Sequence, residues 1–334
     1  MIEMKATVFI PTWFGEQYLD EVLKAVFEQK VDFKYEVLLY DTSSTDKTPK
    51  IIQKYAKKHS NLRYKTLTKE EFGHGKTRDE AAKDAKGEYI VYLTQDATPA
   101  HDRWLYEMIK PFELSDSIVA VVGKQDPRPK AFPLLKGEIR SVFRNLGVDN
   151  GTTIYYLDDF AKTQAQYDEI CFYSDVNSAA RRDFLLNTIP YKHVPYSEDQ
   201  LFGRDLINAG YKKAYAARGN VVHSNDMLLS EYKKRMFDEV VGLRTVGIDV
   251  VSPGFRAVIK LLIKGIVRDW FRTVRDGEYS FKRKVYWFAL NPFFHIEKWR
   301  GFIAGTKVDI TDSEAVRAYS LESHRQTKNQ TKVK

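Results

Sequence analysis

Four short, largely apolar runs, separated by helical patterns, limit the folds open to this chain. The runs span residues 7–10, 35–40, 89–93 and 118–122. None has the alternation of apolar and polar side chains that is typical of a strand with one wet face. Continuous runs of this kind favour strands that are covered on both faces. The sequence therefore predicts a sheet that is buried between two layers of helices.

The connections between these runs carry apolar residues at helical spacing. They are Leu19, Val22, Leu23 and Val26 in the first connection, and Ile51, Ile52 and Tyr55 in the second. A repeating order of strand and helix predicts a mainly parallel, doubly wound α/β sheet. In such sheets ligands bind beyond the carboxyl ends of the strands, so the residues at those ends deserve the closest reading.

Polar groups stand at three of the expected strand ends. Pro11 and Thr12 follow the first run, the segment 41–46 (DTSSTD) follows the second, and Gln95 with Asp96 follows the run at 89–93. A carboxylate at a strand end can accept hydrogen bonds from a base or a ribose, or bind a hard cation. Each residue alone also fits a helix cap or a turn. Three such ends in one sheet favour a shared ligand site.

The segment 72–78 (FGHGKTR) places two glycines and two cations before a helix that we expect to start near Thr77. Glycine allows close backbone approach, and a helix N-terminus with Lys76 and Arg78 favours a phosphate. The spacing of a Walker loop is absent, which argues against an ATPase or a kinase.

Charge is concentrated in one C-terminal segment. Residues 233–307 hold 16 Lys and Arg against 7 Asp and Glu, whereas residues 1–232 hold 32 against 34. A general nucleic-acid-binding protein would spread its positive charge over the folded body, so we rank that class low. The sequence predicts a catalytic domain over 1–232, a basic, aromatic helical region over 233–307, and a polar, flexible tail over 308–334.

Residues 255–275 (FRAVIKLLIKGIVRDWFRTVR) predict an amphipathic helix. Its basic residues lie four apart, at Arg256, Lys260, Lys264, Arg268 and Arg272. We assign its apolar face to Phe255, Val258, Ile259, Leu262, Ile266 and Trp270. Such a helix suits an anionic membrane surface, and the same composition continues over 279–299. Packing on the catalytic domain and contact with a second copy of the chain are the alternatives.

Several classes of protein are excluded by simple counts. The single cysteine, Cys171, rules out an internal disulfide framework and a multi-cysteine metal cluster. No window approaches the roughly 18 uninterrupted apolar residues of a membrane span. The first residues, MIEMKATVFIP, predict a strand and lack the pattern of a signal peptide. We therefore expect a cytoplasmic protein that is peripheral on the inner face of the cell membrane.

The order of the motifs resembles glycosyltransferase family 2, the inverting enzymes with the GT-A fold. The resemblance covers about residues 5–225. It rests on Ile10-Pro-Thr, Asp41-x-x-Ser44-x-Asp46, Gly75-Lys-x-Arg78, Gln95-Asp96-Ala97, Glu198-Asp199-Gln200 and Val222-His223. The segments 72–82 (FGHGKTRDEAA) and 94–97 (TQDA) are similar to those of the bacterial rhamnosyltransferase subgroup, which uses dTDP-L-rhamnose. The implied fold is a Rossmann-like, mainly parallel sheet flanked by helices, here with a C-terminal helical extension.

The resemblance also implies roles for individual residues. Asp199 is the catalytic base, and Asp96 and His223 contact a divalent cation, Mg²⁺ or Mn²⁺. Glu198 shapes the acceptor site, and Trp104 is a candidate to stack on a sugar ring, with core packing as its alternative. The donor-binding set is Pro11, Thr12, Asp41, Ser44, Lys76, Arg78, Gln95 and Asp96. Asp96 is the one acid left of the family's Asp-x-Asp motif, which leaves few charged metal ligands.

The reaction implied is transfer of a sugar, L-rhamnose by the closer resemblance, to a hydroxyl of a growing cell-surface polysaccharide. The acceptor is expected to be a saccharide or lipid-linked saccharide. The QxxRW signature of processive synthases is missing, so we expect one or a few sugars per encounter. A transferase using another nucleotide hexose, and a nucleotidyltransferase that makes sugar nucleotides, remain as alternatives. Acceptor, linkage, preferred metal and oligomeric state are not determined by the sequence.

Overall fold

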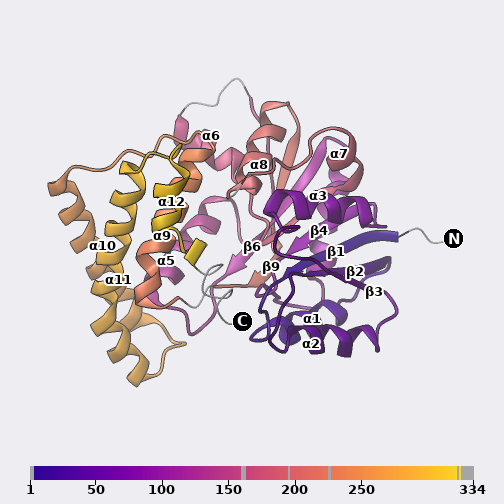
Figure 1. Ribbon diagram of the computed structural model, residues 1–334, viewed down its shortest axis with the longest axis horizontal. Helices are drawn as coiled ribbons and strands as arrows, with labels where there is room; N and C mark the ends of the chain where they lie inside the picture. Colours follow the sequence, from indigo (N-terminus) through magenta and orange to yellow (C-terminus); the bar gives the residue numbers. More distant parts are fainter. Residues whose placement is uncertain (1–3, 159–162, 195, 225–226, 322, 325–334) are drawn as a thin grey trace. The chain divides into compact units, whose positions relative to one another are not determined.

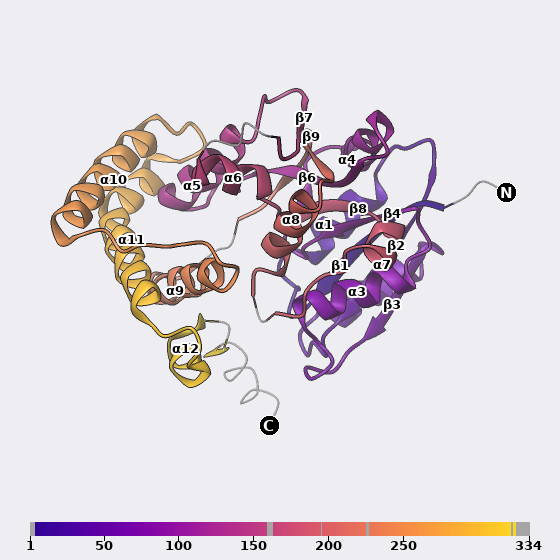
Figure 2. The same cartoon turned by 90° about the horizontal axis from the view of Figure 1, so that it is seen from above.

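The computed structural model describes residues 4–158, 163–194, 196–224, 227–321 and 323–324. The chain divides into two compact units. The first comprises Met1–Asp126 and Arg140–His223, and the second comprises Pro127–Ile139 and Ser224–Lys334. Figure 1 traces both units along the chain, and Figure 2 shows them from above. Each is described in turn.

The first unit is built on a mixed sheet of nine strands in the described residues. Its strands are β1 (Met4–Thr12), β2 (Lys34–Asp41), β3 (Leu62–Thr66), β4 (Tyr89–Leu93), β5 (Thr98–Pro99), β6 (Ile118–Asp126), β7 (Thr152–Tyr155), β8 (Asn177–Arg181) and β9 (Lys212–Val222). The spatial order is β3-β2-β1-β4-β8-β6-β9-β5, with β7 paired to β9. The pairings give β1, β2, β3, β4, β6 and β9 one direction, while β5, β7 and β8 oppose them. The sheet is therefore mainly parallel, as predicted.

Helices cover both faces of this sheet. They are α1 (Leu19–Phe27), α2 (Thr48–Ala56), α3 (His74–Asp84), α4 (Trp104–Ile109), η1 (Lys110–Leu114), α6 (Gln164–Cys171), α7 (Arg182–Asn187) and α8 (Glu198–Asn208), while α5 (Pro133–Asn145) crosses from the second unit into the first. Helices α1 and α2 lie on one face, and α3 and α7 on the other (Figure 1).

The main core shows why these residues form these elements. Val8 of β1, Leu39 of β2 and Val91 of β4 are completely buried against Leu19 and Ile52 of the two helices on that face. The strand runs lack polar alternation because the opposite face is also covered, where Phe9 packs edge-on against Tyr40 and Tyr92. All four predicted strands and the helices α1 and α2 are confirmed. Helix α3 begins at His74, three residues before the expected start.

The second unit is helical. It contains the start of α5 with α9 (Leu229–Thr245), α10 (Phe255–Arg275), α11 (Phe281–Lys307) and α12 (Ser313–Tyr319). Its core comprises Phe132, Leu134, Tyr232, Met236, Tyr279, Trp287 and Phe294. The buried Lys136 Nζ lies 2.6 Å from Asp276 Oδ2 and 2.7 Å from Glu278 Oε2. A buried charge must be paired to be tolerated, so these ion pairs hold α5 to the connection between α10 and α11.

The observed division differs from the predicted domains. It falls after His223, nine residues before the predicted boundary at 232, and the segment 127–139 joins the second unit although it lies in the predicted catalytic domain. Helix α12 lies within the predicted polar tail, and residues 325–334 of that tail lie outside the described residues. Among the described residues, no helix is long and apolar enough to cross a bilayer.

Candidate active site

The carboxyl ends of β1 and β2 bring together three predicted donor-binding residues. Thr12 and Asp41 are register partners, and the Thr12 hydroxyl donates to Asp41 Oδ1 at 3.1 Å. The Ser44 hydroxyl donates to the same oxygen at 2.6 Å, and the Ser44 amide donates to Asp41 Oδ2 at 3.0 Å. All three residues are buried. Asp41 therefore also closes the turn after β2, which is the structural role that its position allowed.

The end of β4 is tied to the end of β1 by Gln95. Its Oε1 accepts from the Trp13 amide and its Nε2 donates to the Trp13 carbonyl, each at 2.9 Å. Both polar groups of this side chain are thus engaged with one residue of the neighbouring loop. Gln95 shapes the loop after β1 and holds the next residue, Asp96, beside it.

Asp96 faces a histidine that comes directly after β9. Asp96 Oδ2 and His223 Nε2 are 3.6 Å apart. The other ring nitrogen, Nδ1, lies 3.1 Å from Oε1 of Gln125 on β6. Burial by itself raises the pKa of Asp96, but the charge and hydrogen bond of His223 outweigh burial and lower it to about 2. Asp96 is therefore ionised throughout the physiological range.

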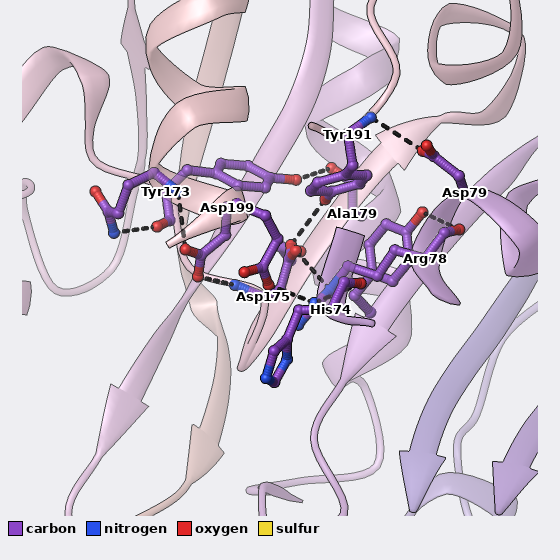
Figure 3. Close-up of polar contacts among 12 residues, drawn as sticks. His74, Arg78, Asp79, Tyr173, Asp175, Ala179, Tyr191 and Asp199 are labelled. Carbon is purple, nitrogen blue, oxygen red and sulfur yellow. Dashed lines mark hydrogen bonds and ion pairs between the residues drawn. The ribbon is translucent and has the colours of Figure 1, made fainter. Parts of the chain in front are cut away.

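Asp199 lies in the first turn of α8, where backbone amides hold its carboxylate (Figure 3). Its Oδ2 accepts from the Asp175 amide at 3.2 Å, and its Oδ1 accepts from the Gln200 amide at 2.8 Å. The side chain remains partly exposed. Burial, followed by the negative charges of Glu198 and Asp175, raises the pKa of Asp199 to about 8, while Arg78 opposes part of the rise.

Arg78 of α3 is buried between two carboxylates. Its Nε lies 2.7 Å from Asp175 Oδ2, and its Nη1 pairs with Glu198 Oε1. The other oxygen of Asp175 accepts from Ser178 Oγ at 2.6 Å and from Tyr191 OH at 3.0 Å. Figure 3 shows Arg78, Asp175 and Tyr191 directed toward one another. This cluster holds the backbone of Asp175 against Asp199.

These contacts form one chain along the carboxyl edge of the sheet. Gln125 Nε2 donates to Ser174 Oγ at 3.2 Å and so links the Asp96 pair to the Asp199 cluster. This series of residues is connected by side-chain contacts, except that Gln95 and Asp96, and Ser174 and Asp175, are neighbours in sequence. Its order is Trp13, Gln95, Asp96, His223, Gln125, Ser174, Asp175 and Asp199. The carboxylates that are scattered in the sequence thus belong to one contiguous polar assembly.

Backbone strain gathers along the same edge. Among the described residues, three non-glycine positions have positive φ: Phe14 at 50°, Ser43 at 49° and Ser197 at 63°. They lie after β1, after β2 and immediately before α8. Each left-handed residue costs of order 1 kcal/mol, and such residues cluster at functional sites. These strained residues lie in the loops next to Thr12, Asp41 and Asp199.

Comparison with known proteins identifies the family. The sequence model described as "Glycosyl transferase family 2" matches residues 7–187. The chain is also 30% identical over 239 residues to the O-antigen chain rhamnosyltransferase RfbN of Salmonella typhimurium, an alignment that covers 70% of this chain and 71% of that protein. The chain belongs to glycosyltransferase family 2. It is an enzyme of the transferase class, as the motif order predicted.

Further relatives of this glycosyltransferase agree. The O-antigen chain rhamnosyltransferase WbaN of Salmonella anatum is 30% identical over 236 residues, which is 70% of each chain. Two solved structures share the fold. Mannosyltransferase PcManGT of Pyrobaculum calidifontis has a TM-score of 0.59 and 16% identity, with 91% of this chain and 88% of that chain covered. TarS 1–349 of S. aureus has a TM-score of 0.51 and 21% identity, with 95% of this chain and 84% of that chain covered. The predicted GT-A architecture is confirmed.

Two residues of the predicted glycosyltransferase site lie elsewhere than expected. Trp104 is completely buried, and its Nε1 donates to Asn177 Oδ1 at 3.0 Å, so its ring lies in the core and has no free face for a sugar. The guanidinium of Arg78 is buried and is paired with the carboxylates of Asp175 and Glu198. We therefore remove both from the binding sets. Both residues were predicted from their positions in the sequence, and sequence position does not show whether a side chain is buried in the folded protein.

The glycine-rich segment also differs from its sequence interpretation. A Cβ on Gly75 would lie 2.3 Å from the carbonyl oxygen of Lys192, so this glycine is required by close packing between α3 and the segment before α8. Lys76, at the start of α3, is half-buried, and its Nζ lies 3.9 Å from Glu80 Oε1. Pro11 is the second-last residue of β1 and is partly buried.

Asp175, Gln125 and Tyr191 belong to the polar assembly but were not among the predicted residues. No short motif marks them, because each contributes through a partner that is distant in sequence. The weak signal was Asp175 itself, an acid placed two residues before a strand of small residues, Asn177–Arg181.

The pair of Asp96 and His223 fits a divalent cation. Ligand atoms 3.6 Å apart can share one ion at metal–ligand distances of about 2.1 Å. Gln125 Oε1 can accept the hydrogen of Nδ1, which is the usual arrangement behind a histidine that binds a metal through Nε2, and Nε2 would give up the proton that it shares with Asp96 when a cation binds. Within the described ranges, no group of three or more His, Cys, Asp or Glu side chains could hold a metal alone.

Proposed function

We propose that this enzyme is an inverting glycosyltransferase that moves L-rhamnose from dTDP-L-rhamnose to a hydroxyl of a growing cell-surface polysaccharide. The proposal includes a lipid-linked acceptor at the inner face of the cell membrane. The observation that carries the transfer chemistry is the polar assembly that connects Asp96 to Asp199. The pKa values of Asp96 and Asp199 are shifted in opposite directions, to about 2 and about 8 respectively. Such a separation is the mark of two carboxylates with different tasks.

Asp199 is the proposed general base. The acceptor oxygen forms a bond to the anomeric carbon while the bond from that carbon to the phosphate oxygen breaks. The hydroxyl proton passes to an oxygen of Asp199, and the nucleoside diphosphate leaves with the electron pair. One displacement of this kind inverts the anomeric carbon and needs no covalent enzyme intermediate. A carboxylate with a pKa of about 8 holds a proton far better than an ordinary aspartate, which suits this task near neutral pH.

The donor nucleotide is proposed to bind along the ends of β1, β2 and β4. Asp41 would accept from the base, with Thr12 and Ser44 holding its carboxylate in place. Pro11 and Gln95 would shape the surrounding loops, and the half-buried Lys76 would reach the diphosphate. Glu198 would act on the acceptor through its effect on Asp199, because its own carboxylate is paired with Arg78.

Asp96 and His223 would hold a divalent cation, Mg²⁺ or Mn²⁺, whose remaining ligands come from the donor diphosphate. The ion would neutralise the charge that develops on the leaving group. The similar structures include PcManGT in complex with GDP-mannose and Mn²⁺, and TarS in complex with UDP-GlcNAc, which supports a cation and a nucleotide sugar as a class. Because the pKa of Asp96 is about 2, its carboxylate stays negatively charged at neutral pH and can attract a cation.

The choice of rhamnose rests on the two relatives that are named rhamnosyltransferases. Nucleotide selectivity tests it. In a thermal-shift experiment with Mn²⁺, dTDP should stabilise the protein more than UDP, GDP or ATP, because a ligand at 100 times its Kd adds about 2.7 kcal/mol to the free energy of unfolding. Stabilisation by UDP or GDP alone would instead support another nucleotide hexose, and the rhamnosyl proposal would fail.

Turnover requires a second experiment. The enzyme is incubated with dTDP-L-[¹⁴C]rhamnose, Mn²⁺ and the total lipid extract of a polysaccharide-producing bacterium. Label should move into the organic phase with wild-type enzyme and not with Asp199→Asn. Label that remains entirely in water-soluble donor, with every extract tried, would refute the lipid-linked acceptor. Release of pyrophosphate from a nucleoside triphosphate and a sugar phosphate would support the nucleotidyltransferase alternative.

A further inference from the structure

Helix α10 exposes a row of apolar side chains. Phe271 is 62% exposed and Ile263 is 54% exposed, which are high values for residues of their size. The exposed row comprises Phe255, Ile259, Ile263, Val267, Phe271 and Val274. The spacing of three to four residues places the row along one side of the helix. An exposed row of this length marks an interaction surface.

A basic row runs beside the apolar one. Arg256, Lys260, Lys264, Arg268, Arg272 and Arg275 are all exposed on α10. The one acidic residue of the helix, Asp269, is fully buried and lies within 3.1 Å of Arg268, Arg272 and His295. Helix α10 therefore presents positive charge and apolar groups to its surroundings, with no exposed acid among its residues.

Helix α11 extends the apolar surface. Phe281 is 81% exposed, and Val285, Phe288, Phe293 and Ile296 are exposed at helical spacing. Trp270 of α10 stacks on Phe288 with ring centroids 4.6 Å apart, and its Nε1 donates to the Phe288 carbonyl at 2.9 Å. Trp270 adjoins the exposed row of α10, so this stack joins the two rows. We call the joined surface the α10–α11 face.

The exposed row of α10 differs from the buried side of the same helix. The buried side consists of Val258, Gly265, Asp269 and Thr273; Asp269 Oδ2 lies 3.0 Å from Nε2 of His295 on α11, and a Cβ on Gly265 would lie 2.6 Å from the same ring. The sequence assigned Val258, Leu262, Ile266 and Trp270 to a free apolar face. That assignment is wrong in part, because Val258 is buried and the other three are partly buried. The free face lies about a quarter-turn further round the helix.

We propose that the α10–α11 face docks this enzyme on an anionic lipid surface. Apolar side chains would enter the boundary between headgroups and acyl chains, while the basic row contacts acidic headgroups. A second copy of the chain is a poorer occupant, because a two-fold contact through this face would bring two basic rows close together. The proposal concerns a surface outside the polar assembly and does not depend on the identity of the donor sugar.

The test is flotation of the full-length protein with vesicles of phosphatidylcholine, with or without 30% phosphatidylglycerol. Wild-type protein should float with the anionic vesicles at 0.1 M salt and lose most binding at 1 M salt, where the Debye length falls to about 3 Å. Lys260→Gln with Lys264→Gln should weaken binding about 5-fold for each charge removed. The matched control is Lys57→Gln with Lys58→Gln, two exposed lysines of the first unit, which should bind as wild type.

The apolar contribution needs its own variant. Ile263→Ser, Val267→Ser and Phe271→Ser together should reduce partitioning more than about 10-fold, whereas Leu114→Ser with Val148→Ser, at exposed positions of the first unit, should not. Retained stabilisation by nucleotide shows that a variant is folded. Absence of wild-type flotation, or equal flotation of the triple variant, overturns the proposal. So does a lipid-free dimer that the triple variant dissociates. None of these outcomes bears on sugar transfer, which nucleotide selectivity and turnover test separately.

Discussion

Replacement of Asp199 by Asn tests the proposed base most directly, because the change removes the proton acceptor and keeps the size of the side chain. Of its two backbone donors, the Asp175 amide on Oδ2 and the Gln200 amide on Oδ1, one can still donate to the remaining oxygen, while the other faces the new NH2 group and loses its acceptor. Loss of a general base costs about 10²- to 10⁴-fold in rate, or about 3–5 kcal/mol in the activation barrier. We therefore expect turnover of dTDP-L-rhamnose to fall by at least 10²-fold while nucleotide binding is unchanged.

The same substitution has a second, independent signature in stability. The pKa of Asp199 is raised in the folded protein to about 8, so the folded state keeps a proton that the unfolded chain loses near pH 4. Folding stability from this group is present below pH 4 and is lost as pH rises toward 8, at roughly 1 kcal/mol per pH unit. Asn does not titrate. The stability of the variant relative to wild type should therefore increase as pH rises from 5 to 8, in thermal melts at each pH.

The wild-type enzyme adds a third observable. Below its pKa the base is protonated, so kcat/KM should rise about tenfold per pH unit and level off near pH 8. The assay is initial-rate transfer from pH 5.5 to 9, with thermal melts under the same conditions. Near-full turnover by Asp199→Asn, or identical pH dependence of melting in the two proteins, would refute the reasoning and remove Asp199 from its assigned role.

Three other changes probe separate parts of the molecule. Arg78→Gln leaves two buried carboxylates without their cation, and should lower the free energy of unfolding by about 3–5 kcal/mol in chemical denaturation; an unchanged midpoint would show that the ion pairs are not needed. His223→Gln should weaken Mn²⁺-dependent binding of dTDP by about 10-fold or more in calorimetry, with metal-free binding as the control. Gly301→Ala places a Cβ 2.2 Å from a backbone carbonyl of α9 and should cost about 1–3 kcal/mol, whereas Gly254→Ala, with open space around it, should cost little; equal melting of the two variants would contradict the packing argument.

Local pattern was sufficient for four of the nine described strands, β1, β2, β4 and β6, and not for β3, β5, β7, β8 and β9. Apolar runs such as 35–40 became β2, and the helical spacing from Leu19 to Val26 became α1, because burial on both faces leaves a signal within a few residues. Antiparallel β8 was not foreseen. Its residues, Asn177–Arg181, include two alanines and lack the apolar run of the other strands, and their pairing with β4 and β6 is formed across more than 50 residues of chain.

The candidate site divides in the same way. Thr12, Asp41, Asp96 and Asp199 could be named from motif order, since each follows a strand or begins a helix. The role of Arg78 could not. Its charge and its position near a helix start suggest a phosphate contact, but the fold buries it between two carboxylates that lie about 100 and 120 residues away.

By itself, the sequence determined four strands with the helices α1 and α2 between them, the family, and the positions where polar groups end three of those strands. Tertiary structure decided which of those groups touch, which are buried, and which face of α10 is left for a partner. The physical reason is one of range. Periodicity and capping act over a single turn or strand, whereas burial and pairing of charges depend on segments that meet only after folding, and these set the proton affinity of Asp199.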